Sequence, residues 1–161
     1  MAKLRKAATA LAVCAAALGG TVGVTGSASA NPGQWYLQRG QTLNPGDSLY
    51  QDVPNGGYLQ LIMQTDGNLV EYHHFGSTFW ACWSTNTWGR GHTDYVTYQQ
   101  DGNFVMYDEN TKGVDWESHT KGVGGTIVNM SPLKNTADNG TVRVGMIFVG
   151  NHLIGDSGCV Y

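Results

Sequence analysis

The sequence predicts an all-β domain built from three similar units, and three observations support this prediction. Residues 31–161 contain no long window with the apolar spacing that is typical of a helix. Short segments in which apolar and polar residues alternate recur instead, separated by Gly, Asn and Asp. In addition, the segment "QTDGNLVEY" at residues 64–72 returns in altered form as "QQDGNFVMY" at residues 99–107.

The first thirty residues are predicted to be a signal peptide. They combine the basic start "MAKLRK", an apolar run too short to span a bilayer, and the small-residue cleavage pattern Ala28-Ser29-Ala30. Residues 31–161 hold no second apolar span, so no membrane insertion is expected. Cleavage near Ala30 therefore predicts a single secreted, extracellular domain over residues 31–161, which is long enough to enclose a core.

The charge of the chain argues against several functions. Nine Lys and Arg residues stand against twelve Asp and Glu residues, and three of the basic residues lie in the predicted signal peptide. Nucleic acid binding depends on clustered Lys and Arg, so we expect no nucleic acid partner. The five His residues are scattered, and the adjacent His73 and His74 point to opposite faces of a strand. We therefore expect neither a metal site nor a cofactor.

Three repeats are predicted, at about residues 56–90, 91–124 and 125–158. Each of the first two holds one motif and then a strand ending in Trp and small polar residues, "FWACWSTNTWG" and "VDWESHTKG". In the third we align Asp138 with the motif Asp. This alignment places the following residues at the Gln, Asn, Val and Tyr positions: Thr136, Gly140, Val142 and Val144. Because only Asp and Val remain, the third copy is expected to have lost the function of the motif.

Each motif is predicted to be a hairpin with a three-residue loop, Thr65-Asp66-Gly67 in the first copy and Gln100-Asp101-Gly102 in the second. The Gly supplies the left-handed conformation that such loops need. In this register Gln64 lies opposite Asn68, and alternate residues share one face of the sheet. The apolar residues on the other face form the core: Leu61, Met63 and Leu69, then Val96, Tyr98, Phe104 and Met106. The outward face carries the two motif sets: Gln64, Asp66, Asn68, Val70 and Tyr72, then Gln99, Asp101, Asn103, Val105 and Tyr107.

One residue breaks the apolar row of the core. Glu71 stands among core positions, and we expect it either at a sheet edge or in a hairpin of different register. We assign Trp83 and Trp116 to the core, where Trp at equivalent repeat positions usually packs. The role of Trp88 is left unassigned, as either a core residue or a residue that stacks on a ligand.

The outward residue types favour recognition of a polyhydroxylated ring. A carboxylate accepts hydrogen bonds, amides donate and accept, and a phenol does either, while Val offers a small apolar contact. Catalysis is not expected, because no nucleophile is paired with a base and the two motif Asp residues lie in separate repeats. The predicted protein is therefore a binding protein and not an enzyme.

The paired Gln-x-Asp-x-Asn-x-Val-x-Tyr motifs resemble those of the bulb-type mannose-binding lectins, a family known from monocot plants and also found in bacteria. The segments "LQRGQTLNPGDSL" (37–49), "NGGYLQLIMQ" (55–64) and "WST" (83–85) resemble the same family. The resemblance covers residues 31–122 and, more weakly, 123–161. It implies a β-prism of three four-stranded antiparallel sheets with pseudo-threefold symmetry, in a secreted bacterial member.

The resemblance also implies a ligand, D-mannose or a mannose-containing glycan, and a role for each motif residue. Asp66 and Asn68 would hold the axial 2-hydroxyl that distinguishes mannose from glucose. Gln64 would bind the 3-hydroxyl, Tyr72 the 4-hydroxyl, and Val70 would pack against the ring carbons. The second copy would repeat these roles in the same order with Asp101, Asn103, Gln99, Tyr107 and Val105.

Two cysteines, Cys82 and Cys159, lie outside the signal peptide. In an oxidising compartment an even pair indicates a disulfide, and the alternative is two buried thiols. A bridge within one chain would fix the tail, whereas a bridge between chains would enforce a homodimer. Relatives in the resembling family often pair by exchanging a terminal strand, for which residues 141–150 are a candidate.

Two alternative functions share the predicted fold. One is a lectin-like antimicrobial toxin that uses glycan binding to reach competing microbes. The other is a protein-binding or inhibitor module without sugar affinity.

Overall fold

The computed structural model describes residues 28–30, 33–54, 56–90, 94–132, 135–136, 142–155 and 159. Every regular element within these ranges is a β-strand, as the sequence predicts. Most of the predicted signal peptide lies outside the described residues, and so does Asp138. Among the residues that are described, no helix is long and apolar enough to cross a membrane.

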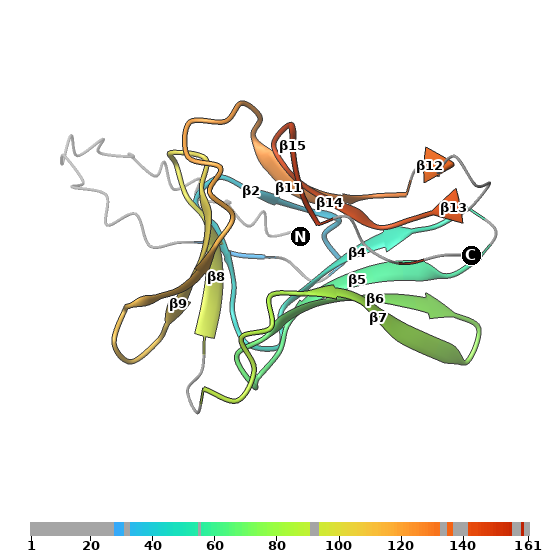
Figure 1. Cartoon of the computed structure of the whole chain (residues 1–161), viewed down its shortest axis with the longest axis horizontal. Helices are drawn as coiled ribbons and strands as arrows, with labels where there is room; N and C mark the ends of the chain where they lie inside the picture. The colour runs from blue at the N-terminus through green and yellow to red at the C-terminus, as the bar shows by residue number, and fades with distance from the viewer. Residues whose placement is uncertain are drawn as a thin grey trace, which may run out of the picture.

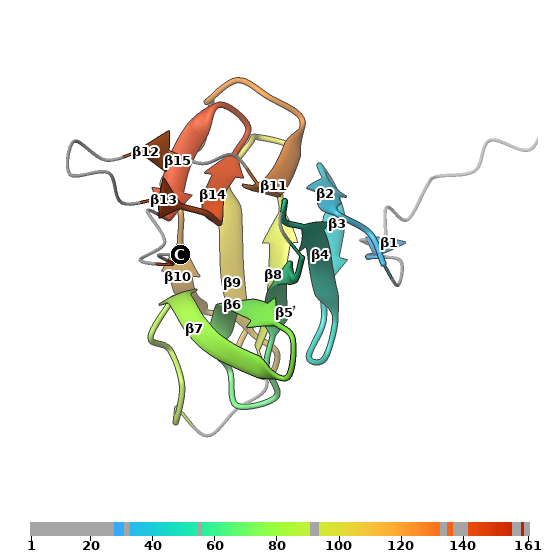
Figure 2. The same ribbon diagram turned by 90° about the vertical axis from the view of Figure 1, so that its right-hand side faces the viewer.

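Three four-stranded antiparallel sheets surround one core, which confirms the predicted β-prism (Figures 1 and 2). The first sheet runs β4 (Ser48–Asp52), β5 (Tyr58–Met63), β6 (Leu69–Phe75) and β7 (Thr78–Ser84). The second has the order β3 (Gln41–Leu43), β8 (Asp94–Tyr98), β9 (Phe104–Asp108) and β10 (Val114–Glu117). The third has the order β15 (His152–Gly155), β14 (Met146–Val149), β11 (Ile127–Ser131) and β2 (Tyr36–Gln38).

The N-terminal strands tie the repeats together. Each repeat supplies three strands, and β2, β3 and β4 each add a fourth strand to a different sheet. Three short strands complete the described part of the fold. β1 (Ala28–Ser29) pairs in parallel with β3, and β12 (Asn135–Thr136) pairs with β13 (Val142–Arg143). Since β1 precedes Ala30, cleavage at the predicted site would remove it and leave β3 as the edge of the second sheet.

The core lies where the inner faces of the three sheets meet. Leu61, Met63 and Leu69 from the first hairpin are fully buried, as predicted. The second hairpin contributes the predicted set Val96, Tyr98, Phe104 and Met106. Trp83 and Trp116 pack against this core with their rings 5.9 Å apart in a T-shaped arrangement, which confirms their assignment.

The expectations for Glu71 are wrong, because Glu71 lies inside the first sheet and the hairpin of β5 and β6 keeps the predicted register there. The register shift beside Glu71 belongs to the pairing of β6 with β7. It is fully buried on the core face of β6, paired with Leu61 in β5 and with Trp83 in β7. Gly145 leaves room for the carboxyl group, since a Cβ atom there would stand 2.5 Å from Glu71 Oε1. Neither carboxyl oxygen has a hydrogen-bond partner among the described residues, and burial raises the pKa of Glu71 to about 9. Glu71 is therefore a neutral acid in the core at neutral pH.

The two cysteines form a disulfide within one chain, Cys82–Cys159, with their Cα atoms 5.0 Å apart. The bridge joins the middle of β7 to the C-terminal tail across 77 positions of sequence. In the chain-entropy model a closed loop of this length stabilises the fold by about 4 kcal/mol. The candidate segment for exchange, residues 141–150, contains β14, which is paired on both sides by β11 and β15 of its own chain.

The third repeat has a different register from the predicted one. β11 and β14 pair with Ser131 opposite Met146, and Gly145 N donates to Ser131 O at 3.1 Å. The corresponding bonds in the first two repeats run from Gly67 to Gln64 and from Gly102 to Gln99. The third hairpin therefore holds an insertion over residues 132–145, and the alignment through Asp138 is wrong. The insertion contains β12 and β13. Because of it, the third-repeat residues that correspond to the motif do not lie where the spacing between the first two repeats predicts them.

Candidate carbohydrate-binding site

The first two motifs form tight hairpin turns of the predicted kind. Gln64 N donates to Asn68 O at 2.9 Å, and Gly67 adopts a φ of +84°. In the second motif Gln99 N donates to Asn103 O at 2.9 Å, and Gly102 has a φ of +91°. Only Gly enters this left-handed region at low cost, which explains the Asp-Gly pair in both motifs. Both three-residue loops and their register are confirmed.

The motif side chains lie on the outward face of the sheet, as predicted. Gln64 Nε2 donates to Tyr72 Oη at 2.9 Å, so these two residues share a face across the hairpin. Gln99 and Tyr107 make the same contact in the second motif. Because each phenol oxygen accepts a hydrogen bond from the amide, its own proton is available for a ligand.

The Asp side chains shape the turn as well as facing outward. Asp66 Oδ1 accepts a hydrogen bond from Asn68 N at 3.1 Å, and Asp101 Oδ1 accepts one from Asn103 N at the same distance. Both Asp residues are exposed. Within the described residues the second carboxylate oxygen of Asp66 makes no hydrogen bond with another side chain, so it is available as an acceptor.

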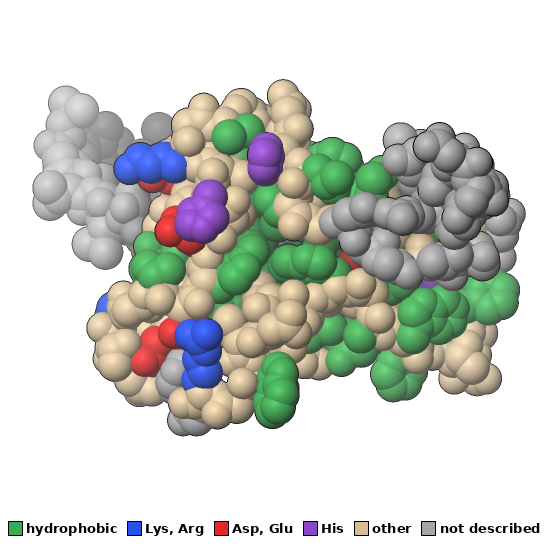
Figure 3. Space-filling model, in the orientation of Figure 1, with side chains coloured by type: hydrophobic (Ala, Val, Ile, Leu, Met, Phe, Trp, Pro, Cys, Tyr) green, Lys and Arg blue, Asp and Glu red, His purple; other side chains and the backbone are tan. Residues whose placement is uncertain are grey.

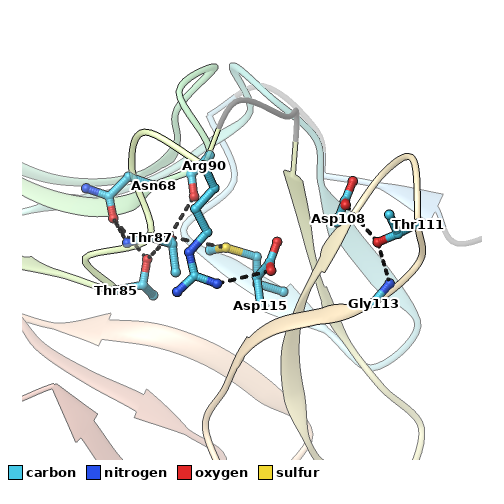
Figure 4. A network of polar contacts seen from close by, with 10 residues as sticks. Asn68, Thr85, Thr87, Arg90, Asp108, Thr111, Gly113 and Asp115 are labelled. Atoms are coloured by element: carbon cyan, nitrogen blue, oxygen red, sulfur yellow. Dashed lines mark hydrogen bonds and ion pairs between the residues drawn. The ribbon is translucent and has the colours of Figure 1, made fainter.

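The Asn side chains have a structural role that the sequence did not reveal. Asn68 Oδ1 accepts hydrogen bonds from Thr85 Oγ1 at 3.0 Å and from Thr87 N at 3.3 Å (Figure 4). Thr87 Oγ1 in turn donates to Gly67 O at 2.6 Å. The segment after β7 is thereby fastened to the turn of the motif.

The second motif repeats this network atom for atom. Asn103 Oδ1 accepts from Ser118 Oγ at 3.2 Å and from Thr120 N at 3.1 Å. Thr120 Oγ1 donates to Gly102 O at 2.7 Å. The signal in the sequence was the pair "TNT" and "SHT", which follow Trp83-Ser84 and Trp116-Glu117 at equal spacing.

The Asn and Val positions of each motif, which were expected on an exposed surface, are more buried than predicted. Asn68 and Asn103 are each 7% exposed, and Val70 and Val105 are 3% and 2% exposed. Each Val is paired across the sheet with a residue of the following strand, Val70 with Ser84 and Val105 with Glu117. The Gln, Asp and Tyr side chains are therefore the more accessible groups of each motif.

The third repeat has none of the polar set at its corresponding positions. In the observed register these positions hold Ser131, Met146, Phe148 and Gly150 in place of Gln, Asn, Val and Tyr. Thr136 and Val142 belong instead to β12 and β13. Val144 is a buried core residue. The third repeat is therefore still predicted to lack a binding site, but the residues that replace the motif are not the ones that the alignment through Asp138 gave.

The first sheet extends beyond its motif by one further cross-strand row. Tyr58, His74 and Phe79 lie side by side there, with the rings of Tyr58 and His74 stacked 4.4 Å apart. Burial lowers the pKa of His74, and its Nε2 lies 3.0 Å from Gln60 Oε1. Within the described residues of the second sheet, β8 begins at Asp94 and β9 ends at Asp108, so no corresponding row is seen there.

The rest of the described surface carries few charges. On the face in Figure 3 basic side chains lie beside acidic ones, without a continuous basic surface. One such pair, Arg90 and Asp115, joins the segment after β7 to β10 at 3.1 Å (Figure 4). Among the described residues no group of three His, Cys, Asp or Glu side chains could hold a metal ion. Trp88 is 67% exposed beside the first motif, which removes it from the core.

No family model matches this chain. A mannose-specific lectin of Dendrobium findlayanum is 45% identical over 74 residues, which cover 46% of this chain and 39% of that protein. Curculin-2 of Molineria latifolia is 39% identical over 74 residues, covering 46% of this chain and 41% of that protein. The chain thus spans about two fifths of the length of these curated relatives. They support the resemblance to bulb-type mannose-binding lectins that the two motifs indicate.

Solved structures of lectins are also similar to this chain. A lectin from Allium sativum is 30% identical, covers 74% of this chain and 97% of its own, and has a TM-score of 0.48. The mannose-specific agglutinin of snowdrop, Galanthus nivalis, was solved with methyl-α-D-mannoside. It is 28% identical, covers 73% of this chain and 91% of its own, and has a TM-score of 0.48.

Proposed function

We propose that this protein is a non-enzymatic lectin that binds D-mannose or mannose-containing glycans through its motif hairpins. The observation that carries the proposal is the convergence of four polar side chains on one face of a rigid turn. In the first motif these are Gln64, Asp66, Asn68 and Tyr72. The mannose specificity in the name of the relative from Dendrobium findlayanum agrees with this arrangement.

The chemistry of the first motif fits adjacent ring hydroxyls. The Asp66 carboxylate would accept a hydrogen bond from the 2-hydroxyl, and the Asn68 amide would donate to the oxygen of the same hydroxyl. Gln64 and Tyr72 would bind the next two hydroxyls. The Tyr72 proton is free to donate because its oxygen accepts from Gln64 Nε2. The hydrogen bonds to Thr85 and Thr87 fix the Asn68 amide in advance, which lowers the ordering cost of binding.

A single shallow site predicts weak binding. Few atoms of a monosaccharide would be buried on this surface, so we expect a dissociation constant in the millimolar range. Binding to a glycan surface is expected to be much stronger wherever several sites engage it together.

The proposal is tested by retention of the purified protein on immobilised mannan with competing free sugars. We expect elution by millimolar mannose and little elution by glucose at equal concentration, because only mannose carries the axial 2-hydroxyl. Equal elution by both sugars would contradict recognition of that hydroxyl. Absence of retention would contradict the lectin proposal and favour a protein-binding module.

We also propose that the protein is secreted after removal of its first thirty residues. The Cys82–Cys159 disulfide supports an oxidising destination.

A further inference from the structure

The two motif sites share one scaffold but differ in the side chains that border it. Asn86 and His119 occupy equivalent positions after β7 and β10, with φ angles of 57° and 56°. The matching hydrogen bonds of Thr87 and Thr120 fix the same alignment. Three positions that face the motif therefore correspond in pairs, with the first site named first: Ser84 and Glu117, Asn86 and His119, Trp88 and Lys121.

Glu117 engages the amide that a sugar would use in the second site. Asn103 Nδ2 donates to Glu117 Oε2 at 2.6 Å. In the first site Ser84 donates to Asn86 Oδ1 at 3.0 Å instead. Asn68 Nδ2 consequently makes no hydrogen bond to another residue of the described chain, and it remains available.

The carboxylate of the second site is also engaged. Lys121 Nζ lies 3.5 Å from Asp101 Oδ2, and His119 Nδ1 lies 3.4 Å from Glu117 Oε1. At the position of Lys121 the first site has the exposed Trp88, which brings no charge toward Asp66. Internal partners thus hold both groups that would grip the 2-hydroxyl in the second site, whereas both groups stay open in the first.

We propose that Glu117 competes with mannosides for the second site, so that the first motif is the main binding site. This inference rests on the proposed lectin function. A neutral hydroxyl would have to displace a charge-assisted hydrogen bond, which is roughly twice as strong as a neutral one. The displaced Glu117 would regain water, because its side chain is 39% exposed. We therefore expect the second site to bind at least about tenfold more weakly than the first, without being blocked absolutely.

The unequal sites change what one chain can do. Two open sites would let one molecule crosslink two mannose residues of a branched glycan, with the gain of avidity that follows. With one open site, a single chain binds one residue at a time. Crosslinking would then require a second copy of the chain.

The test is a titration of the ¹⁵N-labelled protein with methyl-α-D-mannoside, following the side-chain amides of Asn68 and Asn103 by NMR. In the parent protein we expect Asn68 to reach half of its full shift while Asn103 has completed less than about a tenth of its own. Glu117→Ser, which copies Ser84, is expected to make both amides shift. Ser84→Glu is expected to abolish the shift of the Asn68 amide. In the double variant with Ser84→Glu and Glu117→Ser, we expect only the Asn103 amide to shift.

Further measurements distinguish a failure of the Glu117 proposal from a failure of the proposed lectin function. Before any sugar is added, Glu117→Ser should shift the Asn103 amide signal, while Glu117→Gln, which keeps an acceptor, should shift it less. Equal titration of both amides in the parent protein would overturn the inference and leave the lectin function intact. The proposal for Glu117 would also be overturned if the Asn103 amide signal did not shift when mannoside is added to a folded Glu117→Ser protein. No shift at either amide in any variant would overturn the lectin function together with the inference.

Discussion

Asp66→Asn is expected to weaken binding to immobilised mannan by about ten- to hundredfold. Hydrogen bonds to charged groups contribute about 1.5–3 kcal/mol, and the substitution removes the charged acceptor for the 2-hydroxyl. The fold of the turn should survive, because the Asn oxygen can still accept the hydrogen bond from Asn68 N that Asp66 Oδ1 accepts now. Surface plasmon resonance on a mannan surface measures the effect.

Asp101→Asn is the matched control, since Asp101 occupies the same position in the second motif. If Lys121 and Glu117 hold the second site closed, this control should change mannan binding less than twofold. A large loss from Asp101→Asn and none from Asp66→Asn would contradict the assignment of the first motif as the binding site.

Glu71→Met is expected to stabilise the protein, by about 3 kcal/mol at pH 7. Met is the residue at the equivalent core position of the second repeat, Met106, and it fills the space without a polar group. The gain comes from removing a carboxyl that has to stay protonated inside the core, where its pKa is about 9 against 4.5 when unfolded. Each pH unit above 4.5 then costs the folded state about 1.4 kcal/mol.

The sign of the pH dependence follows from proton binding. Between pH 4.5 and about 9 the folded state keeps the Glu71 proton that the unfolded state loses. The contribution of Glu71 to stability is therefore most favourable below pH 4.5, falls steadily as the pH rises, and levels off above about 9. Urea denaturation of the parent protein and Glu71→Met between pH 5 and 9 should show a difference that grows with pH.

Glu71→Gln provides the control for shape, because Gln is nearly isosteric and does not titrate. Its difference from the parent protein should show the same growth with pH. A difference in free energy of unfolding between the parent protein and Glu71→Met that stayed constant from pH 5 to 9 would refute a raised pKa of Glu71.

Much of the fold could be predicted because the two motif hairpins are local structures with strong signals. Asp-Gly at a three-residue turn and alternation around it fix both the register and the inner face, and Met63 and Phe104 are buried as expected. The topology of the N-terminal strands could not be read in this way. Pairing of β2 with β11 or β3 with β8 depends on contacts between distant segments, which leave no local pattern.

The errors have physical causes of the same kind. Glu71 looked incompatible with a core position, but Gly145 of the third repeat provides the space for its carboxyl group. The third repeat was aligned by spacing, and an insertion within its hairpin shifted every position. In the candidate site, the motif residues were found from the repeat itself. Glu117 was missed because it lies in a different strand and matters only through its 2.6 Å contact with Asn103.

Isothermal titration calorimetry of the purified protein with concentrated methyl-α-D-mannoside, and in parallel with the glucoside, measures whether the first motif recognises the axial 2-hydroxyl. We expect a millimolar dissociation constant for the mannoside, near one site per chain, and no measurable heat of binding for the glucoside. Absence of heat with the mannoside, or equal affinity for the two sugars, would contradict this recognition.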